Sequence, residues 1–399
     1  MVLADLRAMR WTAVAAIALI GLAVAIGIVV AAQERALRFA SARAADDFDL
    51  LIGPPGSQTQ LMLTTVFLQP EALPLLRGST LARLQSDPRV LAVAPLAFGD
   101  QTDGLPIVGT TAAFATRWGR LRPSQGRMFE REDEVVIGAS VPLRLGDQIT
   151  PSHAPLGHGA ASHPHENTHY TIVGRMPPLG SPWDRAIVAP IESVWETHGL
   201  GNGHAGDDGA IGPPFDADPP PAVPAIVVKP RSVADAYALR AQFRTGETMA
   251  FFPAEVLVSA YRALGDARDV MVVVAALNNL LVFVAIVLLL VTLTGLRSRR
   301  HALLRALGAS RAYILLVAWC GGAVLMAVGC LSGLLLGWIG AGIVGTIVEA
   351  HTGLALATGV DAEDCVLVAT MALIGSVLAI APALLAWRAS PSAGLRGSA

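Results

Sequence analysis

Two histidines and a glutamate form the pattern in this sequence that most directly suggests chemistry. His165, Glu166 and His169 match H-E-x-x-H, in which two histidines one helical turn apart bind zinc beside a general-base glutamate. That chemistry requires a helix, but Pro164 comes directly before the pattern and Tyr170–Gly174 has the composition of a strand. We therefore do not expect a zinc protease.

Histidines are nevertheless concentrated in one part of the chain, which holds seven of the nine. Neutral imidazoles are good ligands for zinc, copper or nickel, and a histidine-rich tract is a compositional metal signal. The alternative is a solvated loop rich in Gly, Ala and Pro whose histidines bind nothing. Both interpretations stay open. Apart from Zn²⁺ or another transition metal at this histidine-rich loop, we expect no cofactor to be bound by this chain. The candidate ligands are His153, His158, His163, His165, His169, His198 and His204.

Composition places these residues in a membrane protein, because 53% of the chain is hydrophobic and only 15% is charged. Four apolar runs are long enough to cross the hydrocarbon of a bilayer. We read the first as an uncleaved anchor and the long third run as one tilted span. The predicted spans are Trp11–Ala32, Leu277–Leu296, Tyr313–Val348 and Val366–Leu385.

Charge sets the expected orientation. Arg297–Arg311 contains five arginines and no acid between two apolar runs, and positively charged loops stay in the cytoplasm. We therefore expect both termini in the cytoplasm, residues 33–270 outside, and the acidic segment Glu349–Asp364 outside. The chain would be a multi-pass protein of a bacterial cytoplasmic (inner) membrane.

The large external segment is predicted to be a mixed α/β domain. Glu71–Gln85 and Ser232–Phe243 have helical patterns, and Ser232 and Asp235 fit a capping box. The helical pattern from Ala254 runs on into the second span, as a stalk. The expected domains are 1–32, 33–270 and 271–399. Expected strands are Arg89–Ala94, Glu134–Gly138, Tyr170–Gly174, Ala186–Ala189 and Ala225–Lys229.

The spans themselves carry no charged residue, so nothing in them suggests an ion or proton path. Lys229 is the only lysine and follows no glycine-rich loop, so the chain has no P-loop. Small residues recur at every fourth position of the third run and predict a helix-packing face, which could be a dimer contact. They are Gly329, Gly333, Gly337, Ala341 and Gly345.

Several segments together resemble the FtsX-like permeases of ABC transporters, the group that includes MacB and the LolC/LolE lipoprotein-release subunits. The basic segment Arg299–Arg311, the run Gly329–Gly337 and the end of the chain from Pro382 are similar to that family. Asp49–Gly56 and Gly180–Arg185 resemble segments of a MacB-type external domain. The likeness, with the layout of spans, covers essentially the whole chain.

The resemblance implies a cytoplasmic ATPase of the MacB/LolD type as a separate partner, which binds ATP and Mg²⁺. The loop between the second and third spans would be a coupling helix that docks on it. Relatives often have Glu where His301 stands, and often a Glu near Cys320, so this chain lacks a charge that relatives carry at each place. The arginines could alternatively serve orientation alone. The implied coupling residues are Arg299, Arg300, Leu303, Leu304, Arg305, Leu307 and Gly308.

The function so implied is that of a permease subunit, which is not itself an enzyme. Relatives couple ATP hydrolysis to movement of the external domain, called mechanotransmission, and so export or extract a substrate. The alternative is an FtsX-like transducer that activates an external partner such as a cell-wall hydrolase. Expected partners include a second permease copy or a homologous permease, and a periplasmic adaptor or substrate protein, but no nucleic acid.

Overall fold

The computed structural model describes residues 10–153, 165, 168–206, 209–262, 284, 288, 291–292, 303–304, 307–357, 359 and 361–388. The chain divides into two compact units. Unit 1 comprises residues 1–36, 264–347 and 357–399, and unit 2 comprises residues 37–263 and 348–356. Two long helices, α2 (Arg10–Ala45) and α10 (Arg311–Thr352), therefore contribute residues to both units.

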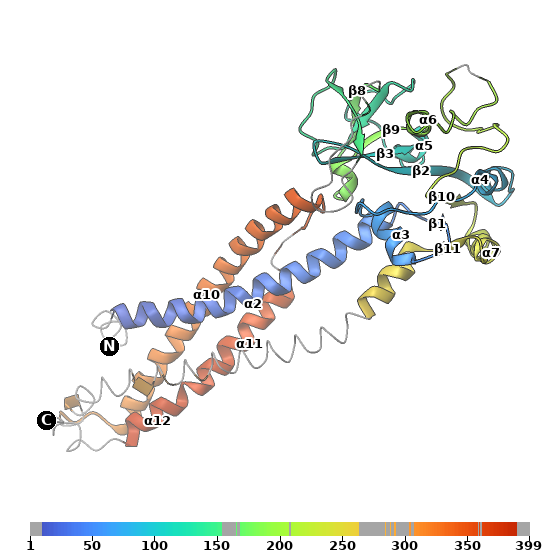
Figure 1. Ribbon diagram of the computed structural model, residues 1–399. Helices are drawn as coiled ribbons and strands as arrows, with labels where there is room; N and C mark the ends of the chain where they lie inside the picture. Colours follow the sequence, from blue (N-terminus) through green and yellow to red (C-terminus); the bar gives the residue numbers. More distant parts are fainter. Residues whose placement is uncertain are drawn as a thin grey trace. The chain divides into compact units, whose positions relative to one another are not determined.

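Unit 1 is helical. Its helices are α2 (Arg10–Ala45), α10 (Arg311–Thr352), α11 (Ala362–Leu378) and α12 (Ile380–Arg388), labelled in Figure 1. Among the described residues, three helices are long and apolar enough to cross a membrane. They correspond to the first, third and fourth predicted spans. The second, Leu277–Leu296, lies largely outside the described residues, so the count of four spans stays a prediction.

The helices extend further than the apolar runs from which they were predicted. Helix α2 continues to Ala45, and α10 is uninterrupted to Thr352, as expected for one span rather than two. The acidic segment predicted as a loop, Glu349–Asp364, is therefore shorter at both ends. Helix α10 includes its first residues, and Asp361 and Asp364 form the capping box that begins α11. The Asp364 side chain is fully buried and accepts a 2.6 Å bond from Arg35, which joins α2 to the start of α11.

The small-residue face of α10 packs against α2 of the same chain. Added Cβ atoms on three glycines would clash with α2 side chains, where the sequence had suggested a dimer contact: Gly329 with Ile20, Gly333 with Val24, and Gly337 with Ile28. Ala341 is also buried, and its carbonyl accepts a 2.9 Å bond from Gln33. Gly345 is buried as well. Small side chains thus allow two helix backbones to approach closely.

Unit 2 contains one mixed sheet, in the order β11-β1-β10-β2-β3-β9-β5-β8-β4, with β6 beside β8 and β7 beside β2. The pairs β3–β9 and β5–β8 are parallel, and the others are antiparallel. The strands are β1 (Leu50–Gly53), β2 (Val90–Thr102), β3 (Leu105–Thr110), β4 (Gln125–Gly126), β5 (Glu134–Ile137), β6 (Gln148–Ile149), β7 (Ser152–His153), β8 (Tyr170–Arg175), β9 (Ile187–Pro190), β10 (Ala225–Pro230) and β11 (Met249–Phe251).

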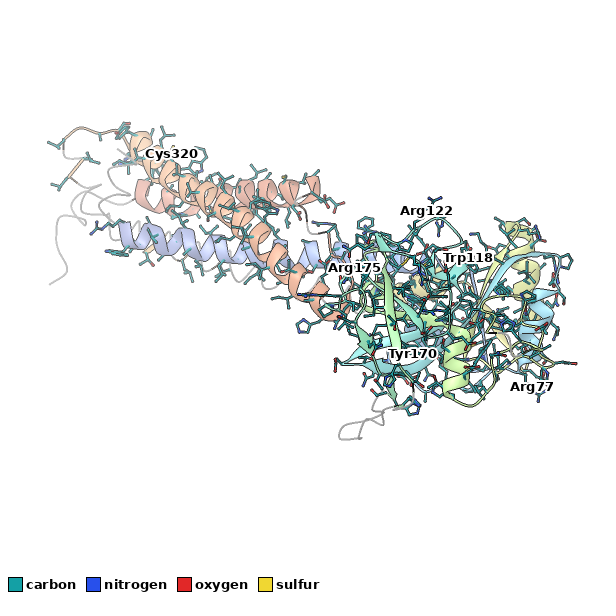
Figure 2. All side chains as sticks on the ribbon, turned by 90° about the horizontal axis from the view of Figure 1, so that it is seen from above. Arg77, Trp118, Arg122, Tyr170, Arg175 and Cys320 are labelled. Atoms are coloured by element: carbon teal, nitrogen blue, oxygen red, sulfur yellow. The ribbon has the colours of Figure 1, made fainter. Side chains whose placement is uncertain are left out.

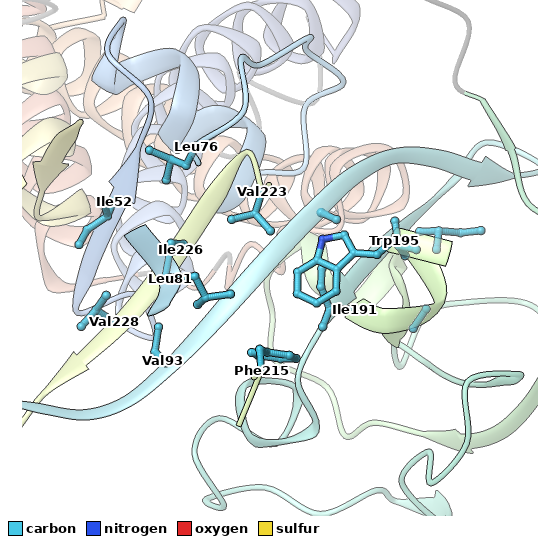
Figure 3. Packing of buried hydrophobic residues seen from close by; sticks show 14 of the residues in the cluster. Ile52, Leu76, Leu81, Val93, Ile191, Trp195, Phe215, Val223, Ile226 and Val228 are labelled. Atoms are coloured by element: carbon cyan, nitrogen blue, oxygen red, sulfur yellow. The ribbon is translucent and has the colours of Figure 1, made fainter. Parts of the chain in front are cut away.

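Both faces of this sheet are buried. Leu50 and Ile52 belong to one hydrophobic cluster, whereas Leu51 between them belongs to another, because successive strand side chains point to opposite faces. Figure 3 shows the first cluster, with Ile226 and Trp195 among its members. The helices of this unit are α3 (Gln58–Thr65), α4 (Gly78–Gln85), α5 (Ala112–Ala115), the 3₁₀ turn η1 (Pro182–Arg185), α6 (Ile191–Thr197) and α7 (Val233–Phe243), and residues 253–262 are also helical.

The five predicted strands are confirmed, and with them the mixed α/β class. The predicted helix Glu71–Gln85 is wrong over its first half, because only Gly78–Gln85 is helical. Pro74 disfavours a helix there, and the Leu76 backbone instead exchanges hydrogen bonds of 2.7 and 3.2 Å with Val223.

The start of α7 corrects a second detail. Ser232 caps the helix by accepting a bond from the Asp235 backbone N–H at 3.1 Å. The Asp235 carboxylate, however, accepts from the Ser232 hydroxyl at 2.7 Å rather than from its backbone N–H, so this is a serine cap without the reciprocal half of the predicted box.

Glu134, at the start of β5, is the buried member of an ion-pair network. Its side chain is 1% exposed and accepts hydrogen bonds from Arg127, Arg131 and the Glu130 backbone N–H. The bond from Arg127, helped by the other two, lowers the pKa of Glu134 to about 2. The carboxylate therefore stays ionised well below the usual range for Glu.

We predict that Glu134→Gln destabilises the protein at neutral pH by about 1–3 kcal/mol, a range kept low because both arginines are solvent-exposed. The folded-state pKa is depressed, so this contribution is present above pH ~4.5 and is lost as the pH falls toward 2. Chemical unfolding of the detergent-solubilised chain at several pH values measures it. The exposed Glu130→Gln is the control, and equal stability of both variants at pH 7 would contradict the prediction.

We also predict that Gly333→Leu destabilises the packing of α2 against α10. A Cβ at this position would lie 2.6 Å from Val24 Cβ and 2.7 Å from the Gly21 carbonyl oxygen, and such overpacking costs on the order of 1–3 kcal/mol. Gly342→Leu, on the same helix but with nothing within 4 Å of an added Cβ, is the matched control. Thermal unfolding in detergent should fall for the first variant only.

Candidate functional site

Three segments of unit 2 converge on the carboxylate of Asp100. Asp100 lies in β2 and is the register partner of His153 in β7. His198 is the residue that ends α6. The His165 backbone N–H donates to the Pro151 carbonyl at 2.9 Å, which places His165 close to the end of β7. A strand pair, a helix end and a loop position therefore supply the four side chains.

The side chains form a compact donor set. The Asp100 Oδ1 atom lies 3.3 Å from His153 Nδ1, 3.5 Å from His165 Nε2 and 3.7 Å from His198 Nε2. One ligand atom from each of the four residues lies within 4.8 Å of every other. The Asp100 side chain is 2% exposed, whereas those of the histidines are 20–46% exposed.

Asp100 is unusual because neither of its carboxylate oxygens has a hydrogen-bond partner among the described residues. A buried polar group without a partner costs about 1–3 kcal/mol, and a charged one costs more. His165 Nε2, which points at this carboxylate, also has no hydrogen-bond partner there. Both an acid and a histidine of the cluster therefore carry buried polar atoms without a hydrogen-bond partner among the described residues.

The His198 ring has a defined orientation. Its Nδ1 atom lies 2.7 Å from the Val194 carbonyl oxygen, which can only accept a hydrogen bond. Nδ1 must therefore carry the proton, and in the neutral ring the lone pair is on Nε2, the atom that faces Asp100.

A cavity of about 580 Å³ adjoins the cluster and is lined in part by Asp100, His153 and His198. Its other walls are mostly apolar, including Phe98 and Trp195. Tyr170, which begins β8 and is labelled in Figure 2, is a buried phenol close to the charge of Asp100. Burial raises the pKa of Tyr170 to about 12, so it stays neutral.

Of the other candidate histidines that the structure describes, His169 and His204 do not join the cluster. His169 Nδ1 lies 3.1 Å from Thr150 Oγ1, and neither His165 nor His169 is helical, so the zinc-protease geometry is absent from these two residues. The buried His204 lies 3.7 Å from Glu192, whose pKa is raised by burial. His158, His163 and Glu166 lie outside the described residues.

Sequence reasoning named three of the four clustered side chains but missed Asp100. The predicted strand ended at Ala94, whereas β2 continues to Thr102. A strand predicted to run on to Thr102 would have placed Asp100 inside the sheet. A carboxylate buried there is costly unless it is paired, so its position would have suggested a binding partner. Only the pairing of β2 with β7, however, shows which histidine lies opposite.

Part of the predicted coupling loop is described. Gly308 has φ +98°, and the Ala309 N–H donates to the Leu304 carbonyl at 3.0 Å, which is the helix-ending bond of a Schellman motif. Leu303 and Leu307 are one helical turn apart and are 50% and 85% exposed. Arg299, Arg300 and Arg305 lie outside the described residues.

The η1 turn and Gly180 before it hold residues 348–356 by hydrogen bonds. Trp183 stacks edge-on against Phe114, and its Nε1 atom donates to the Thr65 carbonyl at 3.2 Å. Arg185 donates to the backbone carbonyls of Ala350 and His351. Gly180–Arg185, the segment that resembles a MacB-type external domain, thus contains the turn that binds the end of α10.

Comparison with known proteins gives matches along most of the chain. Residues 12–245 match the model of the MacB-like periplasmic core domain, and residues 272–391 match that of the FtsX-like permease C-terminal domain. A search of curated proteins finds no match.

Two solved structures are similar over about half of the chain. The periplasmic region of MacB from Actinobacillus actinomycetemcomitans has 11% identity and a TM-score of 0.33, covering 53% of this chain and 92% of its own. The extracellular domain of the noncanonic ABC-type transporter YknZ from Gram-positive bacteria has 12% identity and a TM-score of 0.30, covering 51% and 98%.

The first family model alone spans more than half of the chain, and the second accounts for most of the remainder. The apolar helices and the mixed α/β unit agree with these two assignments. The chain therefore belongs to the FtsX-like permeases of ABC transporters that carry a MacB-like periplasmic core domain.

Proposed function

We propose that this chain couples ATP hydrolysis on a separate cytoplasmic ATPase to movement of its extracytoplasmic domain, and so exports or extracts a substrate. Both termini and the Arg297–Arg311 loop face the cytoplasm, and residues 33–270 face outside. The working assembly contains two permease subunits, identical or homologous, and two copies of a MacB/LolD-type ATPase.

The observation that carries this proposal is the continuity of α2 and α10. In unit 1, α10 packs on α2 through glycine. In unit 2, Ala40 and Ala44 of α2 lie in a hydrophobic cluster with Trp183, and Arg185 binds the last carbonyls of α10. An unbroken helix whose two ends are held by different parts of the protein can transmit a displacement along its axis.

The apolar parts of the described helices favour this mode over conduction. No Asp, Glu, Lys or Arg occurs between Trp11 and Ala32, between Ala312 and Val348, or between Val366 and Trp387. A charged solute passing through them would find no ionisable partner. Substrate handled on the outer side avoids that cost.

The exposed leucines of the coupling segment support docking on a partner. Leu303 and Leu307 present an apolar ridge on one turn of helix. The arginines of the same sequence segment are suited by their chemistry to polar contacts with a partner. Orientation by positive charge alone would not require exposed leucines at this spacing.

We predict that Leu307→Asp, and separately Arg300→Glu, abolish co-purification with the cognate ATPase. The control is Leu91→Asp, an exposed leucine of unit 2 that is 52% exposed, which should leave association unchanged. Pull-down of the co-expressed ATPase from detergent extracts measures this. Undiminished binding by both loop variants would overturn the coupling assignment.

We predict that Arg185→Ala loosens the attachment of residues 348–356 to the η1 turn. Amide hydrogen exchange in that segment should rise, because the Arg185 bonds to the Ala350 and His351 carbonyls are lost. ATP hydrolysis by the complex should persist. Arg122→Ala, an exposed arginine of the same unit (Figure 2), is the control. Unchanged exchange in 348–356 would show that Arg185 does not hold the helix end.

A further inference from the structure

We propose that Asp100, His153, His165 and His198 form a binding site for one divalent transition-metal ion, with Zn²⁺ as the representative ion. The proposal concerns unit 2 alone. It goes beyond the transport function and does not depend on it.

Donor spacing is the first argument. Zinc bonds to imidazole nitrogen and carboxylate oxygen are about 2.0–2.2 Å, which places the donors of a tetrahedral site roughly 3.3–3.5 Å apart. The separations from Asp100 Oδ1 to the three imidazole nitrogens are 3.3, 3.5 and 3.7 Å. The remaining donor pairs lie within 4.8 Å of one another, so side-chain movements on the order of 1 Å would close the set around an ion.

The unpartnered carboxylate is the second argument. Asp100 is buried, its side chain is 2% exposed, and neither oxygen accepts a hydrogen bond among the described residues. A cation at the centre of the cluster would compensate the buried negative charge directly, whereas an isolated buried carboxylate is costly.

The ring orientation of His198 is the third argument. Metal-binding histidines usually donate their second ring nitrogen to a carbonyl or carboxylate, which fixes the tautomer and aims the free lone pair at the metal. The 2.7 Å contact of His198 Nδ1 with the Val194 carbonyl has this form. It leaves Nε2 directed at Asp100.

The donor types select the class of ion. Three imidazoles and one carboxylate suit zinc, copper, nickel or cobalt, whereas magnesium and calcium prefer oxygen ligands throughout. The ion has a route to the site, because Asp100, His153 and His198 border the cavity of about 580 Å³. Four protein ligands make a closed site, which suits metal capture or stabilisation better than catalysis.

A bound ion would tie separate segments together. Its ligands come from β2, from β7, from the end of α6 and from residue 165. Because the unfolded chain does not bring these residues together, binding would stabilise the folded unit.

The test uses the full chain without an affinity tag, purified in detergent and freed of metal with a chelator. Competition with a chromophoric zinc indicator should give one saturable Zn²⁺ per chain. Cobalt substitution should give the visible absorption of a tetrahedral site. Asp100→Asn and His165→Ala should each weaken Zn²⁺ binding at least tenfold and remove the cobalt absorption.

His169→Ala and His204→Ala are the matched controls, because these histidines lie in the same unit and bond to Thr150 and contact Glu192 instead. Both should bind Zn²⁺ as the parent does. The thermal unfolding temperature of each metal-free variant establishes that it is folded, and added Zn²⁺ should raise this temperature only where the four ligands are intact.

Two results would overturn the proposal. One is the absence of saturable binding by the parent chain. The other is loss of binding on combined His158→Ala and His163→Ala substitution with full binding retained by Asp100→Asn, which would place the metal in the histidine-rich segment. Neither result bears on the ATPase pull-down, so the transport proposal and the metal proposal can fail separately.

Discussion

The close approach of α10 to α2 is the contact on which the membrane part of this protein depends. Apolar helices in lipid gain nothing from excluding water, so they associate through close packing and the few hydrogen bonds available. Gly333 allows Val24 and the Gly21 carbonyl to come within van der Waals distance of the α10 backbone. In the same unit, the ion pair of the half-buried Arg35 with the buried Asp364 joins α2 to α11.

Unit 2 meets a different constraint, because both faces of its sheet must be covered. Alternation along β1 sends Leu50 and Ile52 to one cluster and Leu51 to the other. Two buried aspartates in this unit make an instructive contrast. Asp184 accepts backbone N–H bonds from Leu179 and Gly180, so it is a satisfied structural group. Asp100 has no hydrogen-bond partner in the part of the chain that the structure describes, and three imidazoles lie within 3.7 Å of its Oδ1 atom.

The elements of the fold were largely predictable, since their signals are local. Strands such as Tyr170–Arg175 follow from β-branched and aromatic composition, and the long helices follow from apolar length. One error lies where a distant partner overrides a local pattern. Leu76 pairs with Val223 instead of entering a helix. The second error is local, because the Asp235 carboxylate accepts from the Ser232 hydroxyl rather than from its backbone N–H.

The sequence by itself determined the membrane class, because composition carries it, and the stripe of small residues from Gly329, because regular spacing along one helix carries it. The permease family followed from the resemblance of whole segments to known relatives. Tertiary structure alone decided what those features meet. It placed α2 of the same chain against the glycine face, and among the described histidines it brought His153, His165 and His198 together around Asp100. The physical reason is that strand pairing and helix ends bring together residues far apart in the chain, and no local pattern records which residues will face one another.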